Sequence, residues 1–289
     1  LSGMISTSST DGRTGVAATY GVARSTPMVT AGLLGALVTR DYDPQTGFVS
    51  RPNVLMTNPY ATVTMQPAWL PRNVVWFKHG PNAILFQDPT TRRIQEGSFS
   101  YSGEILFRSG ASITPVIEHS LQRPTAPVVL FPRVAIAAGT HDYLRVAAVL
   151  RSDQSANIAG TATVSSGAFF DGSLDRVEFT TRWSPTPYVS LRGSYEMNRL
   201  RSLGTRDSSF VTHLAGPELR VFLNPRLQWS AFYQYNTAVE RGTLNARFSW
   251  EFTPLSFLYV VYNDRQAVLN GTTPTARSLI VKISWLRQL

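Results

Sequence analysis

Four tryptophans near the C-terminus lie beside short turns, each at the same end of a segment whose polarity alternates. They are Trp183, Trp229, Trp250 and Trp285. Indole rings favour the interface between membrane and water, where the ring leaves water and its N–H still finds a partner. A ring repeated at one level on alternating strands is the arrangement that a transmembrane β-barrel requires. This feature constrains the fold more than any other in the chain.

The alternation has a period of two in the C-terminal part of the chain. Apolar and aromatic residues take one side and polar or charged residues the other, with Phe232 as an exception on the polar side. Strands of this kind match the ~9–11 tilted residues that cross a bilayer. The five clearest segments are Arg176–Trp183, Val189–Met197, Leu227–Asn236, Thr243–Phe252 and Ser278–Trp285.

Further segments continue the spacing with less regular alternation. The prediction is an all-β fold of about sixteen antiparallel strands, and no window approaches the ~18 apolar residues of a membrane-spanning helix. Val128–Ala138 is ambiguous between a loop insertion and an inward-folded segment. The further segments are Leu1–Ser9, Arg13–Arg24, Met28–Arg40, Val54–Gln66, Arg72–Phe86, Arg93–Arg108, Ser112–Leu121, Tyr143–Arg151, Ala156–Phe169, Ser209–Phe222 and Leu255–Tyr262.

The connections between the C-terminal segments alternate in length. Tight turns containing proline are predicted at Ser184–Thr186, Leu223–Pro225 and Phe252–Pro254. Long polar loops are predicted at Asn198–Ser208, Asn236–Gly242 and Asn263–Ala276. Short turns at one end and long loops at the other are typical of bacterial outer-membrane barrels, whose short turns face the periplasm.

The alternation assigns two sets of residues to the two sides of the barrel wall. The aromatic girdle facing lipid is predicted to contain Trp183, Tyr195, Trp229, Tyr235, Trp250 and Trp285. The lumen is predicted to be lined by Arg176, Glu178, Arg182, Arg192, Glu196, Glu218, Arg220, Arg247, Glu251 and Lys282. These charges indicate either a pore that selects its solutes or a salt-bridged network that fills a wet interior.

The net charge of +9 has two interpretations. One is attraction to an anionic partner, either nucleic acid or the phosphates of lipopolysaccharide. The other is a set of arginines that line a lumen and its rims. Because the positive residues are dispersed along the strands rather than clustered, the second is favoured and no nucleic-acid partner is predicted.

Catalytic and metal sites have little support in the sequence. The histidines are His79, His119, His141 and His213, and none has a metal-ligand spacing. An outer-membrane hydrolase would need a serine beside a histidine, for which His213, following Ser208–Thr212, is the only candidate. Asp41–Gly47 faintly resembles a calcium loop but is better explained as a turn. We predict no enzyme, no cofactor and no metal.

Eight segments carry recognisable motifs, and together they cover most of the chain, most clearly from about Ser152 onward. They are Arg40–Arg51, Gly167–Asp171, Trp183–Pro185, Ser194–Arg199, Gln234–Asn236, Leu244–Arg247, Tyr259–Asp264 and Arg277–Lys282. These motifs resemble those of an uncharacterised family of bacterial outer-membrane barrels that follow a domain similar to family 9 carbohydrate-binding modules. Arg40–Arg51 is similar to the family pattern F-x-P-x-x-G-F-V-x-R.

The resemblance implies a bacterial outer-membrane location and a preceding carbohydrate-binding-like domain. On this interpretation residues 1–289 form the barrel domain at the C-terminal part of a longer protein, and the strands present here do not close by themselves. The start at Leu1, without a signal peptide, fits a processed chain or such a C-terminal part. Barrel C-termini usually end in an aromatic that the assembly machinery recognises, whereas this chain has Arg287 and Leu289.

The sequence thus predicts a passive pore or transport channel in the outer membrane, with saccharides as a candidate solute class. Its partners are outer-membrane lipid and lipopolysaccharide, the barrel assembly machinery, and a protein at the loops or the periplasmic side. The alternative is a plugged, non-conducting barrel that anchors a partner. An outer-membrane enzyme and a soluble all-β binding protein are further alternatives.

Overall fold

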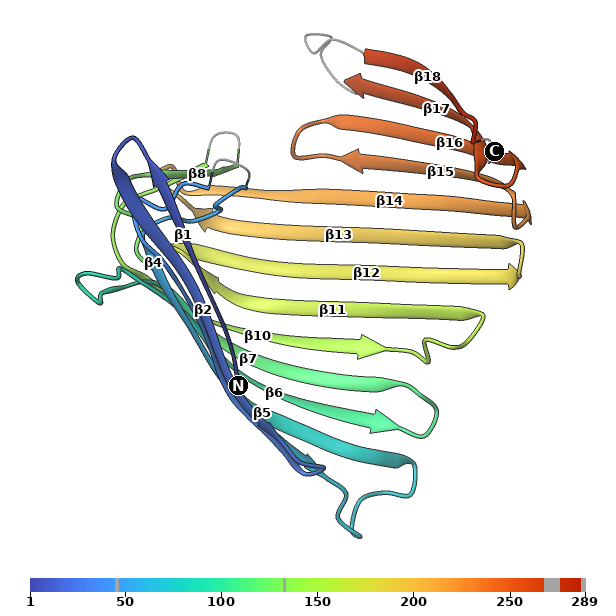
Figure 1. Cartoon of the computed structure of the whole chain (residues 1–289). Coiled ribbons are helices and arrows are strands. Elements are labelled where there is room, and N and C mark those ends of the chain that lie inside the picture. Colours follow the sequence, from blue (N-terminus) through green and yellow to red (C-terminus); the bar gives the residue numbers. More distant parts are fainter. Residues whose placement is uncertain (45–46, 132–133, 268–275, 287–289) are drawn as a thin grey trace. The chain divides into compact units, whose positions relative to one another are not determined.

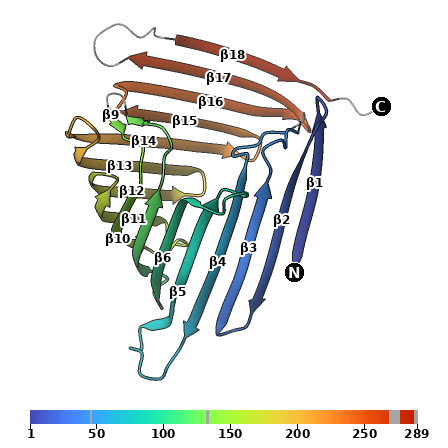
Figure 2. The same ribbon diagram turned by 90° about the vertical axis from the view of Figure 1, so that its left-hand side faces the viewer.

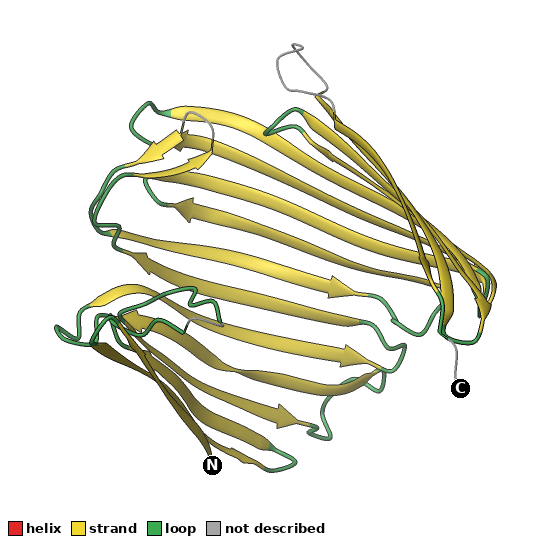
Figure 3. Cartoon of the chain, turned by 45° about the horizontal axis from the view of Figure 1, so that its top comes forward, coloured by secondary structure: helices red, strands yellow, loops and turns green. Residues whose placement is uncertain are grey.

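The computed structural model describes residues 1–44, 47–131, 134–267 and 276–286. Within these residues the chain forms strands and connections, with no helix (Figure 3). Accordingly, no helix in this part of the chain is long and apolar enough to cross a membrane. Sixteen strands form one antiparallel sheet, and two short strands, β8 and β9, form another. The prediction of an all-β chain with about sixteen sheet strands is confirmed.

The strands begin and end close to the predicted residues, because side-chain alternation and β-branched or aromatic content determine where a strand forms. They are β1 Ser2–Thr10, β2 Arg13–Ser25, β3 Val29–Val38, β4 Val54–Met65, β5 Val74–Gln87, β6 Ile94–Phe107, β7 Ser112–Gln122, β8 Val128–Phe131, β9 Val134–Ile136, β10 His141–Arg151, β11 Ile158–Phe169, β12 Gly172–Thr186, β13 Val189–Leu203, β14 Ser208–Asn224, β15 Leu227–Asn236, β16 Arg241–Thr253, β17 Ser256–Ala267 and β18 Ala276–Ser284.

The chain divides into two compact units, each considered by itself below. Unit 1 contains Leu1–Val149, Ser165–Leu174 and Arg201–Ser208. Its strands β1 to β6 run side by side in sequence order (Figure 2). Unit 2 contains Leu150–Val164, Asp175–Leu200 and Ser209–Leu289. Its strands β14 to β18 also follow one another in order (Figure 1).

The strand order of the large sheet begins with β1 and ends with β18. The described residues therefore show an antiparallel sheet, and a closed barrel is not seen among them.

Proline opens the short turns of unit 2. Pro187, Pro225 and Pro254 each follow the last residue of a strand, and each turn has two residues. Proline fixes its own φ near −65°, which suits the first central position of a turn. The predicted turns are displaced by about two residues, because β12, β14 and β16 extend further than predicted.

The prediction of long polar loops is wrong for two connections of unit 2. The β13–β14 connection is residues 204–207, and the β15–β16 connection is residues 237–240. The polar residues that were assigned to these loops continue the strands instead, because hydrogen bonds to neighbouring strands hold a strand end whatever its local composition. The third predicted loop, Asn263–Ala276, lies partly outside the described residues. Arg287 and Leu289 also lie outside them.

The ambiguous segment Val128–Ala138 contains the β8–β9 hairpin, whose residues 132–133 lie outside the described part. Its second strand is buried within unit 1: Ile136 is 0% exposed and Val134 3%. The Ala135 carbonyl accepts a hydrogen bond from the Thr205 N–H at 3.1 Å. A Cβ atom at Gly204 would lie 2.7 Å from the same oxygen, so this close approach needs glycine. The hairpin therefore packs against the turn that begins at Gly204.

Candidate functional site: the polar face of unit 2

Antiparallel pairing arranges the side chains of β14–β18 in rows that cross the five strands. Directly paired residues point to the same side of the sheet. One side, called the polar face here, carries most of the polar residues of these strands. Its rows are Glu218, Phe232, Asn245, Asn263 and Ser278; Arg220, Ser230, Arg247, Val261 and Ile280; and Phe222, Gln228, Ser249, Tyr259 and Lys282.

The opposite side of the same strands, called the apolar face here, has three rows without a charged residue. The next row on this face does contain charged residues: Arg277 Nε lies 3.4 Å from Asp264 Oδ2. The three rows are Leu219, Ala231, Ala246, Tyr262 and Leu279; Val221, Trp229, Phe248, Val260 and Val281; and Leu227, Trp250, Leu258 and Ile283.

The predicted girdle residues lie at both ends of the apolar face. Trp229 and Trp250 occupy adjoining rows near the proline turns, and Trp285, directly after β18, is 78% exposed. Tyr235 lies eight residues from Leu227, which pairs with Trp250. At ~3.3 Å per residue this separation is ~26 Å along the strand, comparable to the ~25 Å apolar band of outer-membrane barrels.

Two further girdle residues lie on β12 and β13. Trp183 stands four residues before Pro187 and is 46% exposed. The Tyr195 hydroxyl is hydrogen-bonded to His213 Nδ1 at 2.8 Å. Since the His213 N–H donates to Thr237, next to the end of β15, Tyr195 lies near the end opposite the proline turns.

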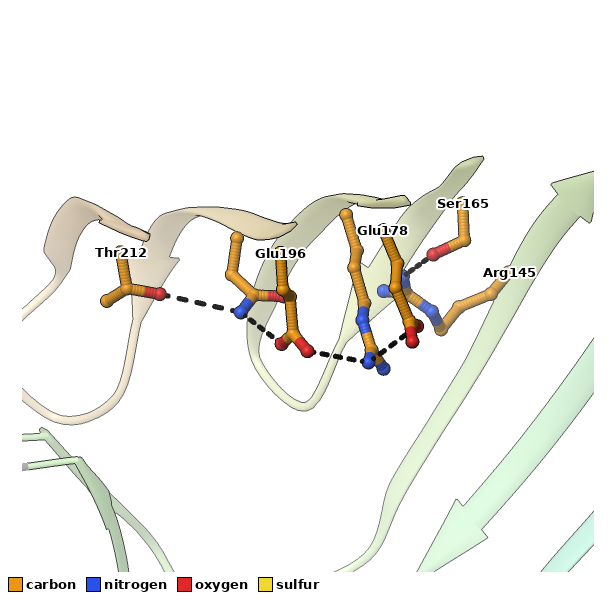
Figure 4. Close-up of polar contacts among 7 residues, drawn as sticks. Arg145, Ser165, Glu178, Glu196 and Thr212 are labelled. Carbon is orange, nitrogen blue, oxygen red and sulfur yellow. Dashed lines mark hydrogen bonds and ion pairs between the residues drawn. The ribbon is translucent and has the colours of Figure 1, made fainter. Parts of the chain in front are cut away.

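Arg176 joins two carboxylates on the polar side of β12 and β13. Its Nη2 lies 3.0 Å from Glu178 and 2.9 Å from Glu196 (Figure 4). Asn198 donates to Glu196 at 2.7 Å and reaches Thr212 of β14 at 3.4 Å. The alternation places Glu178 beside Arg176 on one strand, and Glu196 comes from the neighbouring strand. The positive guanidinium keeps the two negative groups from repelling each other.

The remaining predicted lumen residues have individual partners in unit 2. Arg220 Nε is 2.6 Å from Glu218 Oε1, and the Arg182 guanidinium donates to the Gln154 carbonyl at 2.7 Å. The Arg247 guanidinium lies 5.0 Å from the centre of the Tyr259 ring. Lys282, on the next strand, is the direct cross-strand partner of Tyr259.

Glu251 and Arg192 complete the set. Glu251 Oε1 accepts a hydrogen bond from the Leu255 N–H in the proline turn at 2.8 Å. Arg192 lies two residues from Ser194, whose Oγ would be 2.6 Å from a Cβ at Gly216. Gly216 in turn faces Phe232, so Arg192 shares the polar face. The structure thus places all ten residues on one side of unit 2 and brings five of them into ion pairs.

Gly216 on the neighbouring strand accounts for the presence of Phe232, an aromatic residue, on the polar face. A Cβ at Gly216 on the neighbouring strand would lie 3.3 Å from Phe232 Cε2, so the ring covers the space that glycine leaves. The ring is nevertheless 37% exposed. It borders a hollow of about 340 Å³ that is also lined by Arg182, Arg192 and Glu218. This site was not predicted from the sequence. The feature that could have indicated it is an aromatic residue, Phe232, on the polar side of an alternating strand.

Unit 1 repeats the two-sided pattern in β4–β7. Tyr60, Asn82, Ser100 and Glu118 form a row on one side. Met65, Phe77, Ile105 and Ile113 form a row on the other. Each unit by itself therefore carries an apolar side and a polar side.

Each of the four histidines contacts an aromatic ring or a carboxylate. His213 contacts Tyr195 on the apolar side rather than a serine, and His79 contacts Tyr101. His119 is paired with Asp142, and His141 packs on Phe170 at 5.2 Å.

Within the calcium-like segment Asp41–Gly47, Tyr42 and Asp43 lie against the β1–β2 hairpin. The Asp43 N–H donates to Ser8 Oγ at 2.8 Å, and a Cβ at Gly15 would collide with the Tyr42 backbone. Residues 45–46 lie outside the described part. In the part of the chain that is described, no three metal-binding side chains gather.

Comparison with protein-family models and with curated proteins finds no match for this chain. The likeness to an outer-membrane barrel family therefore rests on the motifs in the sequence alone.

Proposed function

We propose that this chain is the barrel wall of a bacterial outer-membrane pore through which water-soluble solutes pass without energy input. In this proposal the sheet closes in the membrane, with the apolar face toward lipid and the polar face toward a water-filled lumen. Closure uses the free edges of β1 and β18, which pair with each other or with strands that precede this chain.

The observation that carries the proposal is the contrast between the two faces of β14–β18. Three rows across these strands have no charge, while the rows behind them contain Glu218, Arg220, Arg247 and Lys282. Trp229 is 40% exposed, Trp250 44% and Ile283 67%, on the uncharged side. Soluble monomers rarely expose an apolar surface of this extent, whereas lipid covers it at no cost.

The charges of the polar face suit a lumen better than a buried core. Arg176, Glu178 and Arg220 each keep about 40% of their side-chain surface exposed. Buried charges need complete pairing, while partly exposed ones are stable in contact with water. Paired arginines and glutamates would favour solutes of low charge or weak anions over strong cations, given the net charge of +9.

Location and partners follow from the same proposal. The aromatic rows would lie at the two membrane interfaces, Arg277 would reach lipopolysaccharide phosphates, and the assembly machinery would insert the barrel. The motif resemblance supports saccharides as a solute class and a carbohydrate-binding-like domain ahead of this chain.

Single-channel conductance in a planar bilayer tests the pore. The purified protein should give stable steps with a modest anion preference in a KCl gradient. Its electrophoretic migration should also change after heating, as expected for a closed barrel that resists detergent at room temperature. Insertion without any conductance would overturn the pore and leave the second candidate.

The second candidate is a plugged barrel that anchors a partner protein, and the β8–β9 hairpin favours it. Val134 and Ile136 are buried, so this hairpin is a fixed part of unit 1 rather than an open loop. A silent barrel that conducts once the hairpin is removed would support this candidate.

A further inference from the structure

Phe232 lies between two hollows on the polar face of unit 2. On the β14 side is the hollow of about 340 Å³ lined by Arg182, Arg192 and Glu218. On the β16 side is another of about 340 Å³, lined by Asn245, Asn263 and Ser278 and also by Arg265 and the Asp264–Arg277 ion pair. Both belong to unit 2, and a single aromatic ring separates them.

The groups around the ring form a continuous polar row. Glu218 and Asn245 are the direct cross-strand neighbours of Phe232. Asn245 donates to Asn263 at 2.5 Å, and Asn263 donates to Ser278 at 3.2 Å. An amide has two N–H donors and a two-lone-pair oxygen, so each asparagine keeps capacity for another partner. A ligand over the ring would therefore find donors and acceptors on both sides.

Charges of both signs line the two hollows beside the ring. Glu218 is paired with Arg220, and the Arg182 guanidinium already donates to the carbonyls of Gln154 and Ala156. Arg192 and Glu218 lie in the same hollow. An anionic ligand would meet the glutamate and a cationic ligand the arginines. The surroundings thus suit a neutral ligand with many hydrogen-bonding groups.

We propose that Phe232 is the platform of a binding site for a neutral oligosaccharide. A pyranose ring has an apolar C–H face, which stacks on the exposed aromatic, and hydroxyls at its edge, which bond to Glu218, Asn245 and Asn263. Hollows on both sides of the ring fit a linear chain of sugars. This inference rests on the proposed function, because the polar face must be open to solutes.

Calorimetric titration of the full chain in detergent micelles with maltohexaose tests the site. Phe232→Leu keeps apolar bulk over Gly216 but removes the aromatic face, and it should weaken binding by about threefold to tenfold. Phe232→Tyr should stay within about twofold of wild type, because stacking survives. Asn245→Ala should also weaken binding.

Tyr233→Leu is the matched control, since it also replaces an aromatic ring with leucine, one residue away on the opposite side of the sheet. Its binding should equal that of wild type. Absence of maltohexaose binding, an equal loss in Tyr233→Leu, or tighter binding of an anionic oligogalacturonate would overturn the inference.

Conductance measured in parallel separates this inference from the pore proposal. A silent protein whose maltohexaose binding depends on Phe232 would retain the site and reject the pore. A conducting protein without sugar binding would retain the pore and reject the site.

Discussion

At the scale of single residues, Arg176 controls the charge of the polar side of β12 and β13. Replacing it with glutamine removes the cation that bridges Glu178 and Glu196. We expect Arg176→Gln to shift ion preference toward cations, measured as the reversal potential in a KCl gradient. The stability loss should be at most about 1 kcal/mol, because all three side chains are partly exposed and solvent-screened.

Arg226→Gln provides the control for this charge change. Arg226 lies exposed in a proline turn. The substitution Arg226→Gln therefore removes the same positive charge at a position away from the sheet faces. Its reversal potential should stay at the wild-type value. The same shift in both variants would show that overall charge, rather than the Arg176 pairs, sets ion preference.

The stability of the β5–β6 connection should depend on pH through the carboxyl group of Asp88. Hydrogen bonds from the N–H groups of Thr91 and Thr90 hold the pKa of this carboxyl below its ordinary value. A lowered folded-state pKa stabilises the connection above the unfolded pKa of ~3.9, and the contribution is lost as pH falls through the folded value. The protection factors of the Thr90 and Thr91 amides, which correct for the intrinsic slowing of exchange in acid, should therefore fall as pH is lowered. In Asp88→Asn the protection factors should already be lower at neutral pH and should not change in this way with acid.

The side of each strand residue could be predicted from the sequence, and its partners could not. Alternation alone placed Arg176 and Glu196 on polar strand sides. Their contact depends on the register between β12 and β13, which alternation within one strand does not contain. Phe232 broke the pattern for the same reason, since its explanation, Gly216, lies on the neighbouring strand.

At the scale of elements, the β8–β9 hairpin should behave as a packed part of unit 1. Ile136→Ala removes a fully buried side chain, and large-to-small changes of this kind cost about 2–5 kcal/mol. We expect faster proteolysis within residues 128–138. Val129→Ala is the matched control, because Val129 is 70% exposed and its loss should leave cleavage unchanged. Equal cleavage of both variants would show that the hairpin is not docked through Ile136.

The strands could be predicted as elements because 9 to 17 alternating residues give a redundant signal. Their ends could not be predicted. β13 continues through Asn198 to Leu203, although its polar residues suggested a loop. Hydrogen bonds from neighbouring strands hold such an end in place, and these depend on partners rather than on local composition. The hairpin was ambiguous because its short apolar run fits several structures.

At the scale of the whole molecule, the sheet was predictable and its closure was not. Sixteen antiparallel strands follow from repeated alternation and short connections. Closing a sheet depends on the pairing of its first and last strands and on the stagger between them. No pattern within a strand specifies either, so closure is a matter for experiment.

Val260 and Val261 test at this scale whether the apolar face meets lipid. They are neighbours in β17 with similar burial, but Val260 is paired with Phe248 and Val261 with Arg247. Val260→Glu should destabilise the protein in lipid vesicles by about 2 kcal/mol, since a charge on the lipid side must leave water. Val261→Glu should cost little, because it faces the Arg247 guanidinium across the strands. Urea unfolding followed by tryptophan fluorescence measures both. Equal losses would mean that the two faces have similar surroundings, which a barrel wall between lipid and water excludes.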